Sequence, residues 1–262
     1  MKHIALPVFL VAAGNIWGQA GANLTALGGN TANPDAAFSL TNNPAHFVNN
    51  KAELGVWGTN RFTGTNLVNG GFAFHAVHAH SAIGFSADYS GSPLFHKTGF
   101  YLHGGQKFKD NFSCGFSIGY RHLFQANEYR GIRGRVTGKL ATHFAFTKKA
   151  DAALVISNPW MVKDEWSLAP SSIHLSLGYL VATGSKVYAQ FKQQNESSAI
   201  FGLALVHKFR EQFEFRAALQ NGYEPLSIGI SWKQKNLSLS LASAYHTYLG
   251  FSPAFSLLWQ KS

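Results

Sequence analysis

The chain has 262 residues, of which 46% are hydrophobic and only 13% are charged, and its formal net charge is +10. Soluble domains usually contain about 25% charged residues, so this composition excludes a disordered or coiled-coil protein and is poor in the groups that keep a surface wet. The single cysteine, Cys114, also excludes a disulfide framework and a multi-thiolate zinc site, which leaves a soluble all-β or α/β fold or an unusual membrane protein.

Residues 1–20 are typical of a secretory signal peptide. Lys2 and His3 precede an apolar stretch over 4–13, and Ala20 offers a small residue for cleavage. The apolar stretch is far shorter than the ~20 residues that a spanning helix needs, and no later segment is long enough either. The sequence therefore predicts an exported protein without transmembrane helices. The alternative is that the stretch forms a buried strand or helix.

Residues 21–50 are irregular. They contain seven Asn and two Pro and show no sustained periodicity, so we expect neither a strand nor a long helix. Proline removes a backbone donor and Asn side chains bond the local backbone, which together suit a segment held inside a polar lumen. We therefore predict a hatch, or plug, at 21–50. A disordered periplasmic arm is the alternative.

Residues 51–262 are dominated by period-2 alternation, which is the pattern of a strand with two different faces. In 172–179 the odd positions are apolar or aromatic, whereas the even positions are Ser, His or Gly. A sandwich would carry charged residues on its outer face, whereas a face of Gly, Ser and Ala suits a confined interior. The sequence therefore predicts an all-β fold, a transmembrane antiparallel β-barrel. The fourteen predicted strands cover 53–61, 71–78, 81–89, 98–108, 111–123, 136–146, 151–157, 172–182, 186–193, 199–209, 213–220, 226–233, 237–246 and 252–260.

The connections support this interpretation, because outer-membrane barrels have short turns on one side and longer loops on the other. Tight polar turns are predicted at 109–111, 148–150, 183–185, 210–212 and 234–236. Longer loops are predicted between them, at 62–70, 89–97, 124–135 and 158–171. This alternation places the long loops outside the cell and the tight turns in the periplasm.

Four charged or titratable residues are expected to point into the lumen, namely Arg121, His143, Glu214 and Arg216. Buried charges persist only when they are paired, so we predict a luminal polar network that fixes the hatch or neighbouring strands. A substrate path is the alternative.

The histidines invite metal and catalytic interpretations that the pattern does not favour. His78 and His80 share one face of a strand while His75 points the other way, so too few ligands converge for zinc. His174 and Ser176 share a face, but no third orienting group is identifiable. We predict no metal, no cofactor and no catalytic residue.

Two predicted loops carry candidate contact residues. Arg130, Arg133 and Arg135 lie in the loop expected outside the cell, where guanidinium groups match lipopolysaccharide phosphates. A simply solvated loop is the alternative, and the export signal argues against nucleic acid. The second loop holds apolar residues that are costly to expose unless a partner or the barrel mouth covers them. The candidates for partner binding are Trp160, Met161, Trp166 and Leu168.

Two short stretches resemble one family. Residues 26–40 are rich in Gly and Ala and precede the motif Asn43-Pro44-Ala45, and residues 245–252 read Tyr-His-Thr-Tyr-Leu-Gly-Phe-Ser. These stretches are similar to the PorV/PorQ-like outer-membrane proteins of Bacteroidota, within the FadL-like superfamily. The resemblance implies a fourteen-stranded barrel with an N-terminal hatch. The chain departs from the family at His46, where glycine is usual, and at its C-terminal end.

The sequence thus favours a non-enzymatic outer-membrane barrel that acts as an accessory subunit of a larger assembly, which the resemblance places in type IX secretion or related machinery. Its partners would be lipid, lipopolysaccharide and other outer-membrane proteins or lipoproteins. The alternative is a FadL-like channel for uptake of hydrophobic compounds. Short loops and a small lumen are expected to leave little room for a ligand cavity.

Overall fold

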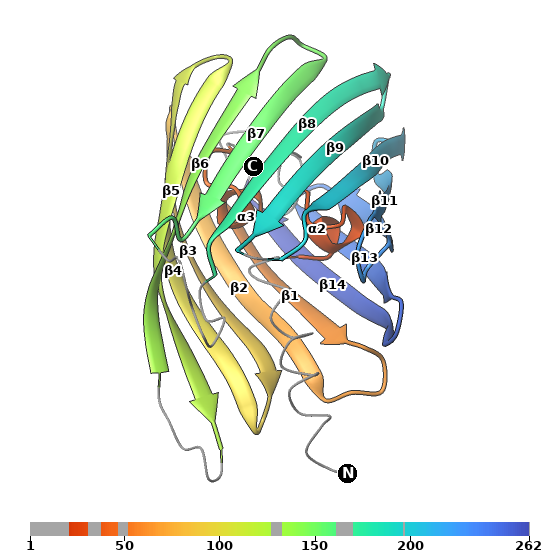
Figure 1. Ribbon diagram of the computed structural model, residues 1–262. Coiled ribbons are helices and arrows are strands. Elements are labelled where there is room, and N and C mark those ends of the chain that lie inside the picture. Colours follow the sequence, from red (N-terminus) through yellow and green to blue (C-terminus); the bar gives the residue numbers. More distant parts are fainter. Residues whose placement is uncertain are drawn as a thin grey trace.

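The computed structural model describes residues 21–30, 38–46, 52–126, 133–160, 170–195 and 197–261. Its strands form one closed barrel, in which each strand pairs antiparallel with its neighbours along the chain and β1 pairs with β14 (Figure 1). This confirms the predicted antiparallel barrel of fourteen strands. The strands are β1 (Glu53–Arg61), β2 (Leu67–His78), β3 (Ser81–Ser92), β4 (Phe95–Lys109), β5 (Phe112–Gln125), β6 (Arg133–Ala145), β7 (Ala150–Ser157), β8 (Ser172–Ala182), β9 (Ser185–Gln194), β10 (Ile200–Arg210), β11 (Phe213–Gln220), β12 (Leu226–Gln234), β13 (Leu237–His246) and β14 (Gly250–Gln260).

The alternation in sequence corresponds to the two faces of the wall. In β8 the outward Leu177 is 49% exposed, whereas the inward Ser176 is completely buried. The same contrast separates Leu241 from Ser240 in β13 and Ile118 from Ser117 in β5. A belt of exposed apolar side chains around a small, polar interior is the arrangement that a bilayer requires of a barrel. No helix among the described residues is long and apolar enough to cross a membrane.

The two ends of the barrel differ. The connections β2–β3, β4–β5, β6–β7, β8–β9, β10–β11 and β12–β13 are two to four residues long, and we call this end the turn side. The opposite end, the loop side, lies at the bottom of Figure 1 and carries connections of five residues or more, except for β3–β4 and β13–β14, which are two and three residues long. Two predicted long loops are wrong in extent, because β2 begins at Leu67 and β3 and β4 leave only residues 93 and 94 between them. Glycine and serine at these strand ends hide the pattern of a strand.

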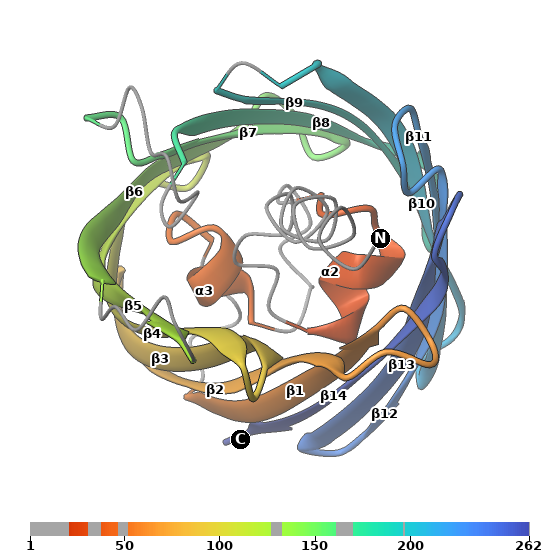
Figure 2. The same cartoon turned by 60° about the horizontal axis from the view of Figure 1, so that its bottom comes forward.

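A segment of the chain lies inside the barrel. We call the described residues 21–30 and 38–46 the luminal segment; it contains the short helices α2 (Ala22–Ala26) and α3 (Ser39–Asn42). Figure 2, which looks into the barrel, shows both helices enclosed by the strands. α2 packs against β11–β14 and β1, and α3 against β3 and β4. The segment therefore contacts both halves of the wall.

Small residues on the inner face make room for this segment. The Phe38 ring packs edge-on against Trp57, with centroids 5.0 Å apart, and covers Gly55, where any side chain would overlap the ring. Leu27 packs with Tyr188 and with alanines of β7, β10 and β11. Glycine on this face thus permits close approach of the luminal segment, and close approach is one of the ordinary uses of glycine in strands.

Candidate functional site

A chamber of about 140 Å³ lies in the loop-side half of the lumen. Its walls come from β1 to β9, and the luminal segment contributes Leu24, Gly29, Thr41 and Asn42. The sequence predicted too little room for such a cavity. The luminal segment packs against β11–β14 and β1 through α2, against β3 and β4 through the short α3, and against the turn-side half of β5 through Ala45. The space between these contacts and the wall forms the chamber.

The chamber is strongly basic. Among its described lining residues, Lys97, Arg121, Lys139 and Lys192 are cationic and Asp88 is the one carboxylate, so four positive charges and one negative charge give +3. Arg121 Nη2 and Asp88 Oδ2 form an ion pair of 3.1 Å, and the Arg121 guanidinium also lies 5.7 Å from the centre of the Tyr101 ring. The carboxylate is therefore committed to Arg121.

Two histidines line the same chamber. His103 bridges neighbouring strands, with Nε2 2.8 Å from Ser86 Oγ and Nδ1 2.7 Å from Ser117 Oγ. His174 Nε2 lies 3.4 Å from Ser176 Oγ, but no carboxylate within the described residues contacts its ring. A nucleophilic serine needs a histidine oriented by a third group, so this pair lacks the arrangement of a catalytic triad.

The predicted motif Asn43-Pro44-Ala45 is buried inside the barrel. Ala45 N donates to Asn43 Oδ1 at 3.0 Å, which closes a local turn. Ser113 Oγ of β5 donates to Ala45 O at 2.5 Å, and Lys139 Nζ donates to Thr41 O at 3.3 Å. The strands thus hold this part of the luminal segment by its backbone carbonyls.

The four residues predicted as a luminal network all face inward, but they lie in three separate groups. Arg121 belongs to the chamber. His143 Nε2 lies 3.3 Å from Asp151 Oδ2, which also accepts from Lys186 Nζ at 2.8 Å, nearer the turn side. Glu214 pairs with Arg216, and Arg216 donates to Asn23 Oδ1 of α2 at 2.5 Å. The last group ties the wall directly to the luminal segment.

The residues predicted for loop contacts are only partly described. Arg130, Met161, Trp166 and Leu168 lie outside the described residues. Arg133 and Arg135 are exposed at the loop-side end of β6, and their register with β5 places them on the lumen-facing side. Trp160 is 56% exposed and its ring lies over Gly138, on the outward face of β6.

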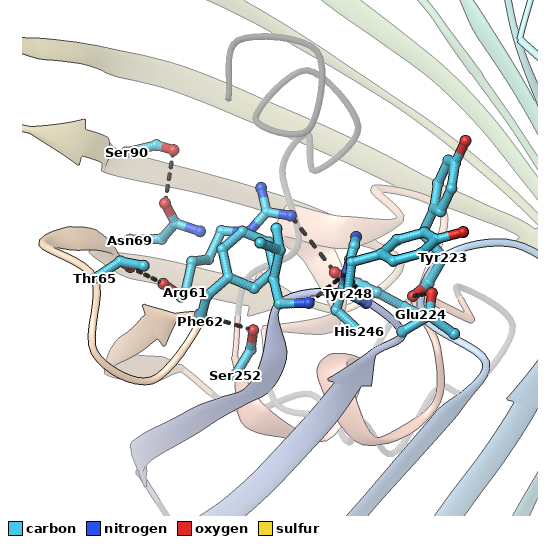
Figure 3. Close-up of polar contacts among 12 residues, drawn as sticks. Arg61, Phe62, Thr65, Asn69, Ser90, Tyr223, Glu224, His246, Tyr248 and Ser252 are labelled. Carbon is cyan, nitrogen blue, oxygen red and sulfur yellow. Dashed lines mark hydrogen bonds and ion pairs between the residues drawn. The ribbon is translucent and has the colours of Figure 1, made fainter. Parts of the chain in front are cut away.

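A cluster that the sequence did not predict closes the loop-side rim near β1 and β14 (Figure 3). Arg61 Nη2 and Glu224 Oε1 form an ion pair of 3.5 Å between β1 and the β11–β12 loop. Phe62 is buried with a positive φ of 62°, and its ring lies edge-on to His246 with centroids 5.1 Å apart. Phe62 N donates to Ser252 Oγ at 3.1 Å. The cluster turns the β1–β2 loop inward.

Replacing Ser252 with alanine is expected to lower the free energy of unfolding by about 1–3 kcal/mol, because the buried Phe62 N–H then has no acceptor. Chemical unfolding of the protein folded into lipid vesicles measures the change. Ser243→Ala is the matched control, since Ser243 lies on the outward face of β13. Equal effects of the two substitutions would contradict this role of Ser252.

No group of three or more His, Cys, Asp and Glu side chains within the described part of the chain is arranged to hold a metal ion. His75 faces the lumen and its Nε2 lies 2.8 Å from Glu53 Oε2. His78 is exposed at the end of β2, so the histidines at 75 and 78 do not converge.

No protein-family model matches the sequence, and no curated protein matches it. Solved structures similar to it include the CymD monoaromatic hydrocarbon channel, with a TM-score of 0.66 and 12% identity over 93% of this chain and 97% of that one. The TodX deltaS2S3 mutant monoaromatic hydrocarbon channel has a TM-score of 0.69 and 11% identity over 92% of this chain and 98% of that one. A Pseudomonas aeruginosa FadL homologue has a TM-score of 0.63 and 10% identity over 92% of this chain and 98% of that one.

These likenesses concern the fold and agree with the predicted FadL-like superfamily. They give no support to the narrower PorV/PorQ resemblance, to a source in Bacteroidota or to type IX secretion. The motifs behind that resemblance, such as Asn43-Pro44-Ala45, are short, and the structure explains the motif by local turn geometry. The chain has the fold of the FadL-like outer-membrane channels.

Proposed function

We propose that this protein is a passive channel of the bacterial outer membrane that admits small organic compounds of predominantly hydrophobic character. The observation that carries the proposal is the chamber between the wall and the luminal segment, in a barrel whose fold is shared with hydrocarbon channels. Catalysis has no part in it. The comparisons favour this alternative over the accessory-subunit hypothesis.

The proposed orientation puts the loop side outside the cell and the turn side in the periplasm, with the apolar belt in lipid. A compound then enters the chamber from the loop side, among lipopolysaccharide headgroups. The register shifts in the wall, at Lys107/Lys109, Leu180/Ala182 and Lys208/Arg210, lie at the turn side. Around the chamber the strands pair regularly, so the way onward leads past the luminal segment, which acts as the hatch.

Filling the chamber is expected to abolish uptake. Thr137 is a buried lining residue of β6, and Thr137→Trp places a large ring in a chamber of about 140 Å³. The measurement is the initial uptake rate of labelled toluene in cells that produce the protein in the outer membrane. We expect wild-type protein to raise the rate above that of cells lacking it and Thr137→Trp to return it to that background.

Val136→Trp is the matched control, because the neighbouring side chain points outward into lipid. It adds the same ring to the same strand and is expected to keep the wild-type rate. Folding of each variant is checked by heat-modifiable migration on a gel. A wild-type rate equal to that of cells without the protein would refute the proposed function.

A partner-binding role is a second proposal, carried by Trp160. Its ring is exposed on the outward face at the loop side, where aromatic side chains anchor interfaces. Affinity purification of a tagged copy at native expression, compared with Trp160→Ser, tests it. A partner protein lost with the substitution would support the role, and recovery of the barrel alone would count against it.

A further inference from the structure

The charge of the chamber is unexpected for a compartment that admits only hydrocarbons. We propose that the chamber is a binding site for a small organic carboxylate of about one aromatic ring, held by Lys139 and Lys192. The inference rests on the proposed function, since it names the class of compound that the channel admits. It is carried by three features of the chamber: the two lysines Lys139 and Lys192, its size and its mixed lining.

Lys192 is the clearest feature. It projects from β9 into the chamber, and no hydrogen bond or ion pair among the described residues engages its ammonium group. Lys139 projects from β6, and its one hydrogen bond goes to the neutral carbonyl of Thr41. The Lys139 charge is repelled by Arg121 and Lys192 and is attracted by Asp88. A carboxylate between the two lysines would relieve this repulsion and supply the missing acceptors.

The carboxylates near the chamber are already paired with arginines. Glu224 attracts the Lys192 charge, but it forms an ion pair with Arg61. Asp88 is the one carboxylate among the described lining residues, and it is paired with Arg121. Cations within the membrane region are costly unless they are paired or face water, and such residues mark binding sites and ion paths. An incoming anion is therefore the natural partner for the excess charge.

The size of the chamber limits the ligand. Its volume of about 140 Å³ matches protein cavities of about 150 Å³ that accept a benzene ring. A long acyl chain would have to extend beyond it. Single-ring carboxylates, of which benzoate is the simplest, carry the required charge on a group of this size.

The lining offers contacts for a ring as well as for a charge. Trp57 and Tyr101 contribute aromatic surface, and Leu24 and Val155 contribute aliphatic surface. Ligand pockets are typically apolar walls with a few convergent polar groups that fix orientation. An inorganic anion would leave the apolar surface without a partner, which is why we assign an organic ligand.

Calorimetric titration of the full-length protein in neutral detergent tests the inference, with benzoate as the probe. We expect benzoate to bind, benzamide to bind more weakly, and added salt to weaken benzoate. Lys139→Met and Lys192→Met are each expected to weaken benzoate binding by about tenfold or more. Lys233→Met is the matched control, because it removes the same charge at the exposed turn-side end of β12.

Several results would overturn the inference. Benzamide binding as tightly as benzoate would show that charge is not recognised. Inorganic phosphate displacing benzoate at equal concentration would show a site for any anion, and an equal effect of Lys233→Met would show only a dependence on net charge. Benzoate binding without toluene uptake in cells would support the carboxylate site and refute the proposed channel. Toluene uptake without benzoate binding would support the channel and refute the carboxylate site.

Discussion

Replacing Arg216 with methionine is expected to lower the free energy of unfolding by about 3–5 kcal/mol, the usual effect of removing one partner from a buried ion pair. The Arg216 side chain is only 3% exposed. It pairs with Glu214, donates to Asn23 of the luminal segment and contacts Ser231. Methionine fills similar volume but leaves the Glu214 carboxylate without this partner. Chemical unfolding of the protein folded into lipid vesicles measures the loss.

Two further variants identify the cause of that loss. Arg210→Met removes the same charge at the exposed turn-side end of β10 and is expected to change stability by no more than about 0.5 kcal/mol. The double variant Arg216→Met with Glu214→Gln also removes the carboxylate charge, which Arg216→Met leaves with the more distant Lys208 at 3.9 Å, so it should be more stable than Arg216→Met alone. If the double variant is no more stable, the loss of the Glu214–Arg216 pair is not the source of the effect.

The barrel itself was largely predictable because its two faces contact such different surroundings. Strand β8 alternates apolar residues with Ser, His and Gly without exception over 172–178. The sequence therefore shows both that this segment is a strand and which of its side chains face the lipid. Beyond Tyr89 the loop-side end of β3 reads Ser90-Gly91-Ser92, where no apolar residue marks an outward face. Its strand character depends on pairing with β2 and β4, which single-sequence periodicity does not contain.

The chamber was less predictable than the wall. Asp88, Lys139 and Lys192 each occupy a position that alternates with the outward apolar residues of its strand. The sequence therefore indicated that each of these side chains faces the lumen. Their meeting in one chamber depends on barrel closure and on where the luminal segment packs. Position along the barrel axis likewise separates Arg121 from Arg216, although both face inward. An odd or even position in a strand shows which face of the wall a side chain lies on. Its height along the barrel axis depends on the register between neighbouring strands.

The basic residues that give the chain its positive charge lie in two different environments. At the turns, lysines such as Lys148 and Lys149 are exposed, where a membrane surface offers phosphate groups. Inside the chamber, Lys139 and Lys192 are half-buried, and neither forms an ion pair with a carboxylate of the described residues. The first setting concerns lipid contact, and the second concerns the solute that we propose.

Leucine in place of Gly115 is expected to displace the luminal segment from β5. An added Cβ at Gly115 would overlap the backbone of Pro44 and Ala45, which cannot swing aside as a side chain does. Overpacking of this kind costs about 1–3 kcal/mol, and that range corresponds to a shift of roughly 5- to 150-fold in an equilibrium. The equilibrium between the docked and the undocked luminal segment should therefore shift toward the undocked state by that factor.

Ion conductance across a planar bilayer measures the displacement, and limited proteolysis of the segment provides a second readout. Both are expected to rise in Gly115→Leu, because the segment no longer fills the lumen at this height. Gly104→Leu is the matched control: Gly104 faces outward in β4, where the added side chain meets only the movable ring of Phe116. A folded Gly115→Leu barrel with wild-type conductance and proteolysis would mean that β5 does not hold the luminal segment, and that other contacts, such as Arg216 with Asn23 and Lys139 with Thr41, suffice to keep it in place.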